Sequence, residues 1–270
     1  MLQRAKVIAQ VAQHAGIKPD ILQEALKPTV TAIQRSVPSW VFLGPPGVGK
    51  GTYASRVADA LGIAHISAGD LVRTVMKEQT ELGRKVATVV NEGNLLPDSY
   101  VLQLLQKRLQ EGARRGEEGV LLDGFPRTRA QAESLLTFSD VQLALNLSLR
   151  EDVLIAKCLA RRNCKECGKN FNVADIDLPA SPTAPAIKMP PLMPPSGCMA
   201  YLERRSDDNF TTVKRRLEVY HSEAKPVEEV FRQAGVLKDF HITGGISETF
   251  PRLLAALQAR GSITEEKQAA

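Results

Sequence analysis

The sequence predicts an α/β fold in which a five-stranded parallel sheet is covered by helices on both faces. From Trp40 onward, short apolar and β-branched runs alternate with segments whose apolar residues recur three and four positions apart. Such alternation is typical of a parallel sheet with crossover helices. The expected strands span residues 40–43, 63–66, 120–122, 141–149 and 236–242, and the clearest expected helices span residues 52–61 and 100–109.

Composition indicates a globular chain and excludes several classes of protein. Of the 270 residues, 43% are apolar, and no uninterrupted apolar stretch reaches the roughly 18–20 residues of a membrane-spanning helix. We therefore expect no membrane association. The 35 Lys and Arg against 30 Asp and Glu give a net charge of +5, which suits an anionic ligand. Because only 5% of the residues are aromatic and the basic residues form no dense cluster, nucleic acid is not an expected partner.

Two segments depart from the alternating pattern. Residues 1–38 have apolar positions at helical spacing, and we expect a helical extension that either packs on the core or docks a protein partner. This segment lacks the continuous apolar core of a secretory signal, and its acidic residues are unusual for a transit peptide. Residues 179–195 hold seven prolines, which exclude a helix interior and a central strand and predict a loop or an extended insert.

The segment GPPGVGKGT at residues 44–52 follows one expected strand and opens the next expected helix. Glycines let successive backbone N–H groups curl around a phosphate, and the helix N-terminus adds the positive end of its dipole. Lys50 adds a full positive charge for the outer phosphates of a nucleotide. Gly51 stands where Ser or Thr usually follows this lysine, and Thr52 comes next. The segment therefore predicts a phosphate-binding loop for a nucleoside triphosphate.

Three further groups bear on what receives the phosphate. Residues 67–73 (SAGDLVR) follow the second expected strand and residues 123–131 (DGFPRTRAQ) follow the third. Both lie at carboxyl ends of strands, where open α/β sheets bind their ligands. Phosphoryl transfer needs positioning and positive charge rather than a nucleophile. The third group consists of arginines on either side of the proline-rich insert, which are Arg161, Arg162, Arg204, Arg205, Arg215 and Arg216.

From about Trp40 to Leu257 the chain resembles the adenylate kinases. The matching motifs are GPPGVGKGT, ISAGDLVR, EGNLLPD, LLDGFPRTRAQA, LARRNCKECGKNF, RSDDNFTTVKRRLEVYH and the glycine pair of HITGGI. The long insert resembles that of long-lid members, and its sequence is similar to plant and algal plastid-type members. The resemblance implies a P-loop NTPase-type sheet, with hinges near Ala160 and Asp208. The domains it implies are a kinase domain at 39–258, containing a helical NMP-binding lobe at 67–96 and a lid at 160–208, and a tail at 259–270.

The resemblance also implies an activity, which is reversible Mg²⁺-dependent transfer of the terminal phosphoryl group of ATP to AMP, giving two ADP. Mg²⁺ would bind through the ATP phosphates and water, with Asp123 orienting those waters and Asp70 a weaker candidate for that role. The implied catalytic residues are Lys50, Asp123, Arg127, Arg161, Arg205 and Arg216. The implied ATP site comprises Gly47, Val48, Gly49, Lys50, Gly51, Thr52, Arg161 and the carbonyl of Ile246. The implied AMP site comprises Ala68, Arg73, Asn94, Leu95, Leu96, Gly124, Phe125, Pro126, Arg127, Gln131, Arg205 and Arg216.

Two positions depart from the usual pattern of this family. Ala68 replaces a Thr that commonly approaches the AMP base, and Lys157 stands where many members have Arg. Because Ala at the first position is also found in UMP/CMP kinases, a UMP/CMP kinase is one alternative. A GTP:AMP phosphotransferase, which keeps the same scaffold, is the other. Gln131 and the long lid favour AMP.

The lid sequence carries three cysteines, at Cys164, Cys167 and Cys198, that resemble part of the zinc knuckle of many long-lid members. A structural zinc takes four ligands, and Tyr201 stands where the fourth would follow. Reduced thiols are therefore favoured over a structural zinc, with a disulfide as a redox-dependent variant. Cys158 is expected in the core.

The sequence also bears on the oligomeric state and the cellular location of the protein. All the residues that the reaction requires come from one chain, so we expect a monomer. The resemblance favours the plastid stroma, with a mitochondrial or cytoplasmic location as the alternatives.

Overall fold

The computed structural model describes residues 38–266 apart from residue 79 and residues 183–184, with side chains described as far as residue 257. The extension predicted for residues 1–38 thus lies outside the described residues except for Pro38, which begins the first strand. Among the described residues, no helix has the length and apolar character needed to cross a membrane.

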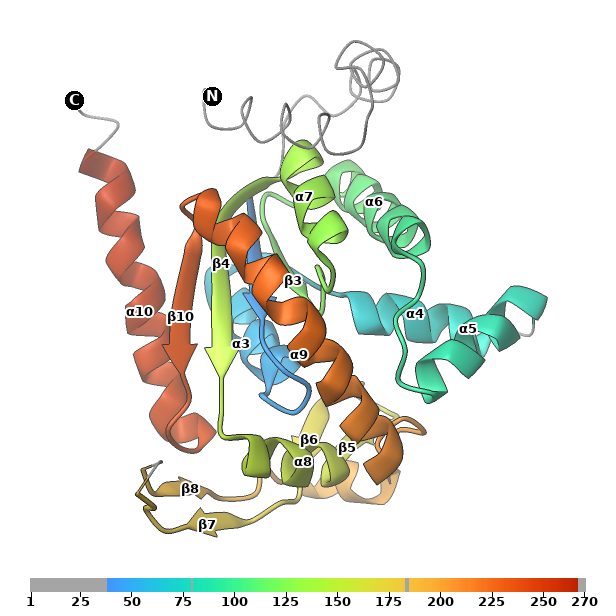
Figure 1. Cartoon of the computed structure of the whole chain (residues 1–270), viewed down its shortest axis with the longest axis vertical. Coiled ribbons are helices and arrows are strands. Elements are labelled where there is room, and N and C mark those ends of the chain that lie inside the picture. Colours follow the sequence, from blue (N-terminus) through green and yellow to red (C-terminus); the bar gives the residue numbers. More distant parts are fainter. Residues whose placement is uncertain (1–37, 79, 183–184, 267–270) are drawn as a thin grey trace.

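The centre of the molecule is a parallel sheet with the strand order β10–β4–β1–β3–β2. All five strands predicted from the sequence are present, each with ends within two residues of the expected positions. Because all neighbouring strands are parallel, their carboxyl ends lie at one edge of the sheet (Figure 1). The strands are β1 (Pro38–Leu43), β2 (Ala64–Ser67), β3 (Val120–Asp123), β4 (Asp140–Ser148) and β10 (Leu237–His241).

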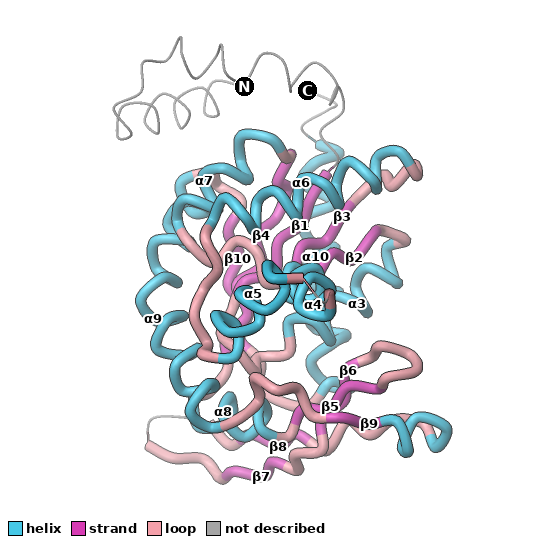
Figure 2. Tube along the Cα trace, turned by 90° about the vertical axis from the view of Figure 1, so that its right-hand side faces the viewer, coloured by secondary structure: helices cyan, strands magenta, loops and turns pink. Residues whose placement is uncertain are grey.

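Helices cover both faces of this sheet, as predicted (Figures 1 and 2). α3 (Lys50–Leu61) and α10 (Ile246–Glu266) pack on one face. α6 (Asp98–Arg114), α7 (Arg129–Phe138) and the second half of α9 (Phe210–Gln233) pack on the other.

The pleat of the strands divides the apolar residues into two cores. Successive strand side chains point to opposite faces, so Phe42 joins the core with α3 and α10, whereas Val41 and Leu43 join the core with α6 and α7. The sheet is therefore buried on both sides, which explains the nearly continuous apolar sequence of its central strands.

Two smaller units extend from the sheet in Figure 1, a helical lobe at the right and a second unit beneath the carboxyl ends of β4 and β10. α4 (Ala68–Lys77) and α5 (Glu81–Asn91) form a helical lobe with its own small core around Val72, Val75 and Val86. Ser67 is the N-cap of α4, and its hydroxyl accepts a hydrogen bond from the Asp70 N–H at 3.2 Å.

The second unit follows α8 (Glu151–Leu159) and contains the cysteines and the proline-rich insert. Its three-stranded sheet has the order β6–β5–β9, and a separate hairpin pairs β7 with β8. Part of the proline-rich insert is therefore extended, as predicted. The elements are β5 (Arg161–Cys164), β6 (Asn170–Asn172), β7 (Ile176–Leu178), β8 (Ile187–Met189), a 3₁₀ helix at Ser196–Tyr201 and β9 (Leu202–Glu203).

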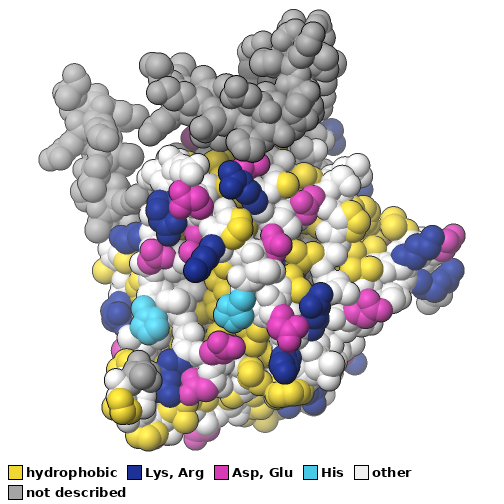
Figure 3. Space-filling view, in the orientation of Figure 1, with side chains coloured by type: hydrophobic (Ala, Val, Ile, Leu, Met, Phe, Trp, Pro, Cys, Tyr) yellow, Lys and Arg dark blue, Asp and Glu magenta, His cyan; other side chains and the backbone are white. Residues whose placement is uncertain are grey.

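On the face drawn in Figure 3, Lys and Arg side chains alternate with Asp and Glu, and hydrophobic atoms lie between them. No continuous basic patch is formed on this face. Such interspersed charges of both signs are typical of the surface of a globular domain.

Candidate active site

The phosphate-binding loop connects β1 to α3 at the centre of the sheet edge. α3 begins at Lys50, so the backbone N–H groups of its first turn point into the loop. The Lys50 ammonium donates to the carbonyl oxygens of Gly44 at 2.6 Å and Pro45 at 3.0 Å. The loop thus binds the Lys50 ammonium through its own carbonyl groups. It lies between a strand and a helix, as the sequence predicts.

Close packing against α8 explains why the loop needs glycine at position 47. Gly47 has φ +87°, in the left-handed region, and a Cβ there would lie 2.5 Å from the Leu154 carbonyl oxygen and 2.9 Å from the Cys158 Sγ. Any side chain would therefore push the loop away from α8. Cys158 is 1% exposed, which confirms its predicted place in the core.

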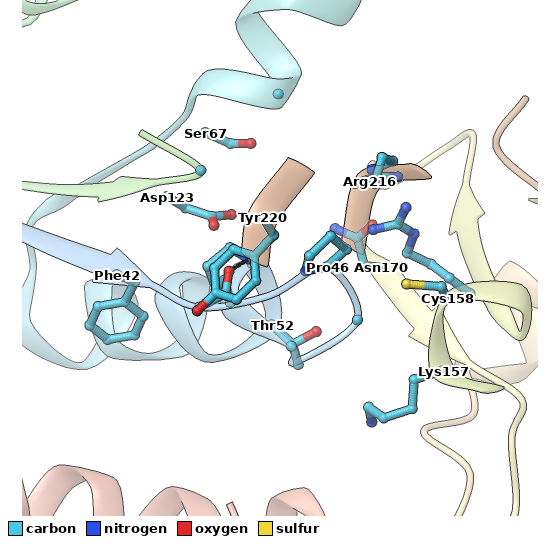
Figure 4. A pocket seen from close by; sticks show the side chains of 18 of the residues that line it. Phe42, Pro46, Thr52, Ser67, Asp123, Lys157, Cys158, Asn170, Arg216 and Tyr220 are labelled. Atoms are coloured by element: carbon cyan, nitrogen blue, oxygen red, sulfur yellow. Dashed lines mark hydrogen bonds between the residues drawn. The ribbon is translucent and has the colours of Figure 1, made fainter. Parts of the chain in front are cut away.

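Asp123 ends β3 beside the start of α3. A Cβ added to Gly51 would lie 3.1 Å from the Asp123 Oδ2, so the carboxylate and the loop are in close approach. The same oxygen lies 3.7 Å from the Nε2 of His65 on β2. Asp123 and Thr52 both line the cavity beside the loop (Figure 4), and such hard oxygen donors fit a Mg²⁺ ion that keeps several waters.

Arginines converge on the loop from the second unit and from α9. Arg161 forms a bidentate ion pair with Asp208, which is fully buried, and Arg216 pairs with Asp207 at 2.7 Å. Arg205 donates to the side-chain oxygens of two asparagines, Asn163 at 3.0 Å and Asn170 at 2.7 Å. Each guanidinium is thereby oriented by a carboxylate or by asparagine side-chain oxygens.

Burial, reinforced by neighbouring positive charge, lowers the pKa values of Lys50, Arg127 and Arg205. Loss of surrounding water, opposed by Asp123 and reinforced by Arg127 and Arg216, lowers the pKa of Lys50 to about 8. Loss of water followed by repulsion from Arg216 lowers the pKa of Arg127, although this side chain remains open to solvent within the cavity. Because each cation disfavours the charged form of its neighbours, a polyanion bound among them would be strongly attracted.

A second polar group comes from α4, α6 and α7, which carry Arg73, Asp98 and Gln131. Arg73 donates to the Asp70 carboxylate from its Nε at 3.1 Å. The side chain of Gln131, 2% exposed, accepts from the Arg127 N–H at 2.8 Å and donates to Asp98 at 2.8 Å. The orientation of this amide is therefore fixed by protein groups at both of its ends.

A single cavity of about 340 Å³ joins these groups. Its lining includes Leu96, which packs on the small core of the helical lobe, Lys50 and the arginines, and Ile246 and Met189, which pack on the core with α3 and α10. Its volume is in the range of small-molecule sites. Two compact organic groups with phosphates between them match this arrangement.

Comparison with known proteins identifies the family. The model of the family described as adenylate kinase matches residues 42–236. The chain belongs to the adenylate kinase family. It is 48% identical to "Adenylate kinase 1, chloroplastic" of Arabidopsis thaliana over 257 residues, which cover 95% of this chain and 89% of that protein. It is also 50% identical to the adenylate kinase of Solanum tuberosum, over 81% of this chain and 76% of that one, and 37% identical to that of Thermotoga neapolitana, over 79% and 94%.

Membership in the adenylate kinase family confirms the fold and the class of enzyme that the sequence predicts. The chain is a phosphotransferase that moves the terminal phosphoryl group of ATP to AMP. Nothing in these comparisons favours a UMP/CMP kinase or a GTP:AMP phosphotransferase.

Most residues that the resemblance assigns to the nucleotide sites of an adenylate kinase come together in the one cavity. Val48 and Phe125 do not line it, because both side chains are 1% exposed and pack in the two cores. The cavity is lined by Gly47, Gly49, Lys50, Gly51, Thr52, Ala68, Arg73, Asn94, Leu95, Leu96, Asp123, Gly124, Pro126, Arg127, Gln131, Arg161, Arg205, Arg216 and Ile246.

Several residues behind these groups escaped the sequence reasoning. Asp98, Asn163 and Asn170 hold Gln131 and Arg205, and none has a local signal of its own beyond its place in a family motif. Asp207 and Asp208 were visible as an acidic pair after the arginines, but only the folded chain shows which arginine each carboxylate holds. Arg162 donates to the carbonyls of Leu159 and Arg161, a structural arrangement rather than a free cation.

The three cysteines of the lid segment form a cluster. The sulfur atoms of Cys164, Cys167 and Cys198 all lie within 4.8 Å of one another, and those of Cys167 and Cys198 are 3.7 Å apart. A hydrogen bond from the backbone of Cys167 lowers the pKa of Cys164. Among the described residues, the group that could hold a metal here contains these three ligands.

Proposed function

We propose that ATP and AMP bind end to end in the cavity, with the donor base at the Ile246 end and the acceptor base at the Gln131 end. The observation that carries this assignment is the continuity of one cavity past the phosphate-binding loop and the arginines. Charge is concentrated in the middle, where the phosphates of both nucleotides would meet. Phosphoryl transfer through a metaphosphate-like state needs this placement of cations.

On the donor side, the N–H groups at the start of α3 and the Lys50 ammonium would hold the ATP phosphates. Lys50 would exchange the carbonyls of Gly44 and Pro45 for phosphate oxygens, which are stronger acceptors. Arg161, Arg205 and Arg216 would stabilise the charge on the transferring group. Their buried or polar partners keep them in position without neutralising the whole cluster.

On the acceptor side, Arg73 and Arg127 would bind the AMP phosphate and Gln131 the adenine edge. A primary amide has two hydrogens and two acceptor lone pairs. One hydrogen of the Gln131 amide is donated to Asp98, and one lone pair of its oxygen accepts the Arg127 N–H. One donor and one acceptor remain on the same amide, which is the complement that an adenine edge offers.

Mg²⁺ fits the oxygen donors described above. Asp123 and Thr52 would hold it, Asp123 through water, and the ion when bound supplies charge neutralisation of the phosphate oxygens. For the lid we propose reduced thiols rather than zinc, since the cluster offers three ligands and a structural zinc takes four.

Lid and lobe movement, assembly and location also remain proposals. Ala160 is the C-cap of α8 and Asp208 lies just before α9, so both proposed hinges lie at helix ends. We propose a monomer, in which residues 1–38 could dock a partner. Relatives named chloroplastic support a plastid location.

A linked bis-adenosine pentaphosphate tests the end-to-end arrangement. We expect it to bind with one molecule per chain and to exclude both ATP and AMP. A coupled assay over a panel of nucleoside mono- and triphosphates should show the highest kcat/KM for ATP with AMP. If the linked compound left the AMP site free, the acceptor assignment would be wrong.

A further inference from the structure

The β7–β8 hairpin packs on the core of the molecule rather than standing free. Ile176, Ile187 and Met189 are 7%, 4% and 3% exposed, and they belong to the same apolar core as Phe42. Figure 2 shows the hairpin beneath the main sheet, next to β5 and β6. The Arg150 guanidinium also donates to the carbonyl of Pro185 at 2.9 Å, which ties the loop of the hairpin to the start of α8.

The chain that leaves this hairpin is fixed at both ends by backbone pairs. Lys188 forms a parallel bridge with Gly244, just before α10. Leu192 forms an antiparallel bridge with Asn172 of β6, with N–H···O distances of 2.8 and 3.1 Å. Between these two points stand Pro190 and Pro191, whose rings restrict φ and leave no N–H to satisfy. The segment 188–192 is thus a short, stiff bridge from the core to the lid sheet.

This bridge lies against a residue that has no side chain. A Cβ added to Gly245 would lie 3.0 Å from the Cδ of Pro190 and 3.9 Å from the Lys188 carbonyl oxygen. A contact of 3.0 Å is tighter than most Cβ contacts, so one of the two groups must move by a few tenths of an ångström to relieve it. Alanine at position 245 would therefore displace Pro190 or the turn that precedes α10.

Met189, Pro190, Pro191 and Leu192 line the same cavity as Ile246, and Pro190 lies against Gly245, the residue before Ile246. We propose that segment 188–192, seated on Gly245, is the outer wall of the donor-base pocket and makes the enzyme prefer a purine donor. This inference rests on the proposed position of the donor base at Ile246. The four residues of this segment that line the cavity present two pyrrolidine rings, a thioether and an aliphatic side chain, and none has a side-chain hydrogen-bond donor, so the wall selects by the apolar area of the base. A purine covers more of that area than a pyrimidine.

Gly245→Ala tests the contact between Gly245 and Pro190. Gly197→Ala is the matched control in the lid segment, because a Cβ at Gly197 meets nothing within 4 Å. Calorimetry with ATP alone measures donor binding without any acceptor. We expect Gly245→Ala to weaken ATP binding about fivefold, the equivalent of about 1 kcal/mol, and to reduce the ratio of kcat/KM for ATP over CTP. AMP binding in both variants, and ATP binding in Gly197→Ala, should match the parent chain.

A double-mutant cycle with Pro190→Ala distinguishes two causes of weaker ATP binding, which are displacement of segment 188–192 and distortion of the start of α10. Removing the proline ring makes room for the added methyl group. In that background Gly245→Ala should change ATP affinity by less than about twofold. An equal loss in both backgrounds, or an unchanged preference for ATP over CTP in Gly245→Ala, would overturn the inference.

The cycle also distinguishes this inference from the proposed function. Failure of the linked bis-adenosine compound to bind would remove the acceptor assignment, yet the calorimetric comparison with ATP would still report on the wall. If that compound bound normally and Gly245→Ala left the ATP affinity unchanged, the proposed function would stand. Only the role of segment 188–192 as a wall of the donor-base pocket would be wrong.

Discussion

Asp98, at the start of α6, fixes the direction in which the Gln131 amide points, because its Oδ1 accepts the Gln131 Nε2–H at 2.8 Å. Its other oxygen accepts the Thr128 hydroxyl at 2.8 Å, at the N-cap of the helix that carries Gln131. A residue 33 positions away along the chain therefore orients the amide that would read the acceptor base.

Asp98→Ala should raise the KM for AMP about tenfold while leaving the KM for ATP nearly unchanged. Without the carboxylate, the amide loses the partner that holds its orientation. Steady-state kinetics in which each nucleotide is varied in turn measures the two KM values. Asp98→Asn retains an acceptor oxygen and should recover part of the loss, and Glu118→Ala, at an exposed acid, should have no effect. Equal increases in both KM values would contradict a role specific to the acceptor.

Lys50 should take up a proton when ATP binds at alkaline pH. Its pKa is lowered to about 8 in the folded chain, so the ammonium is charged below pH 8 and loses its proton above it. Phosphate oxygens favour the charged form and raise this pKa, so affinity for ATP should fall by up to roughly tenfold per pH unit above that point. Calorimetry in buffers of different ionisation enthalpy counts the protons. The uptake should be absent in Lys50→Met, and its persistence there would assign it to another group.

Asp208→Asn should reduce both stability and turnover, because Asp208 is fully buried against Arg161. Breaking a buried ion pair leaves an uncompensated charge and costs about 3 kcal/mol of unfolding free energy. Misplacing a guanidinium at the transferring group should lower kcat about 100-fold. Urea unfolding and kcat check the two effects. Glu203→Gln breaks the exposed pair with Lys165 and should change stability by less than about 0.5 kcal/mol; comparable losses in both variants would show that burial is irrelevant.

Metal removal should leave the lid unaffected. We expect substoichiometric zinc in the purified protein and the same Tm with and without a chelator, because the cluster has three thiol ligands. Elemental analysis and thermal unfolding measure the two quantities. One zinc per chain, with a lower Tm after chelation, would show that a fourth ligand completes the site.

The sequence by itself determined the features that depend on neighbouring residues. The five strands follow from short apolar runs, the phosphate-binding loop from glycines between a strand and a helix, and the cap of α4 from Ser67 three residues before Asp70. These features are local, because their hydrogen bonds and periodicities involve residues a few positions apart. The positions of most nucleotide-site residues followed from the motifs that contain them.

Only the tertiary structure decided which distant groups meet. The strand order places β1 between β3 and β4, and it brings Arg161 to Asp208, Asp98 to Gln131 and Pro190 to Gly245. The proline-rich insert gave no sign that its hairpin would bury Ile187 and Met189 in the main core. Such contacts depend on shape and burial between segments far apart in the chain, and no local pattern of residues encodes them.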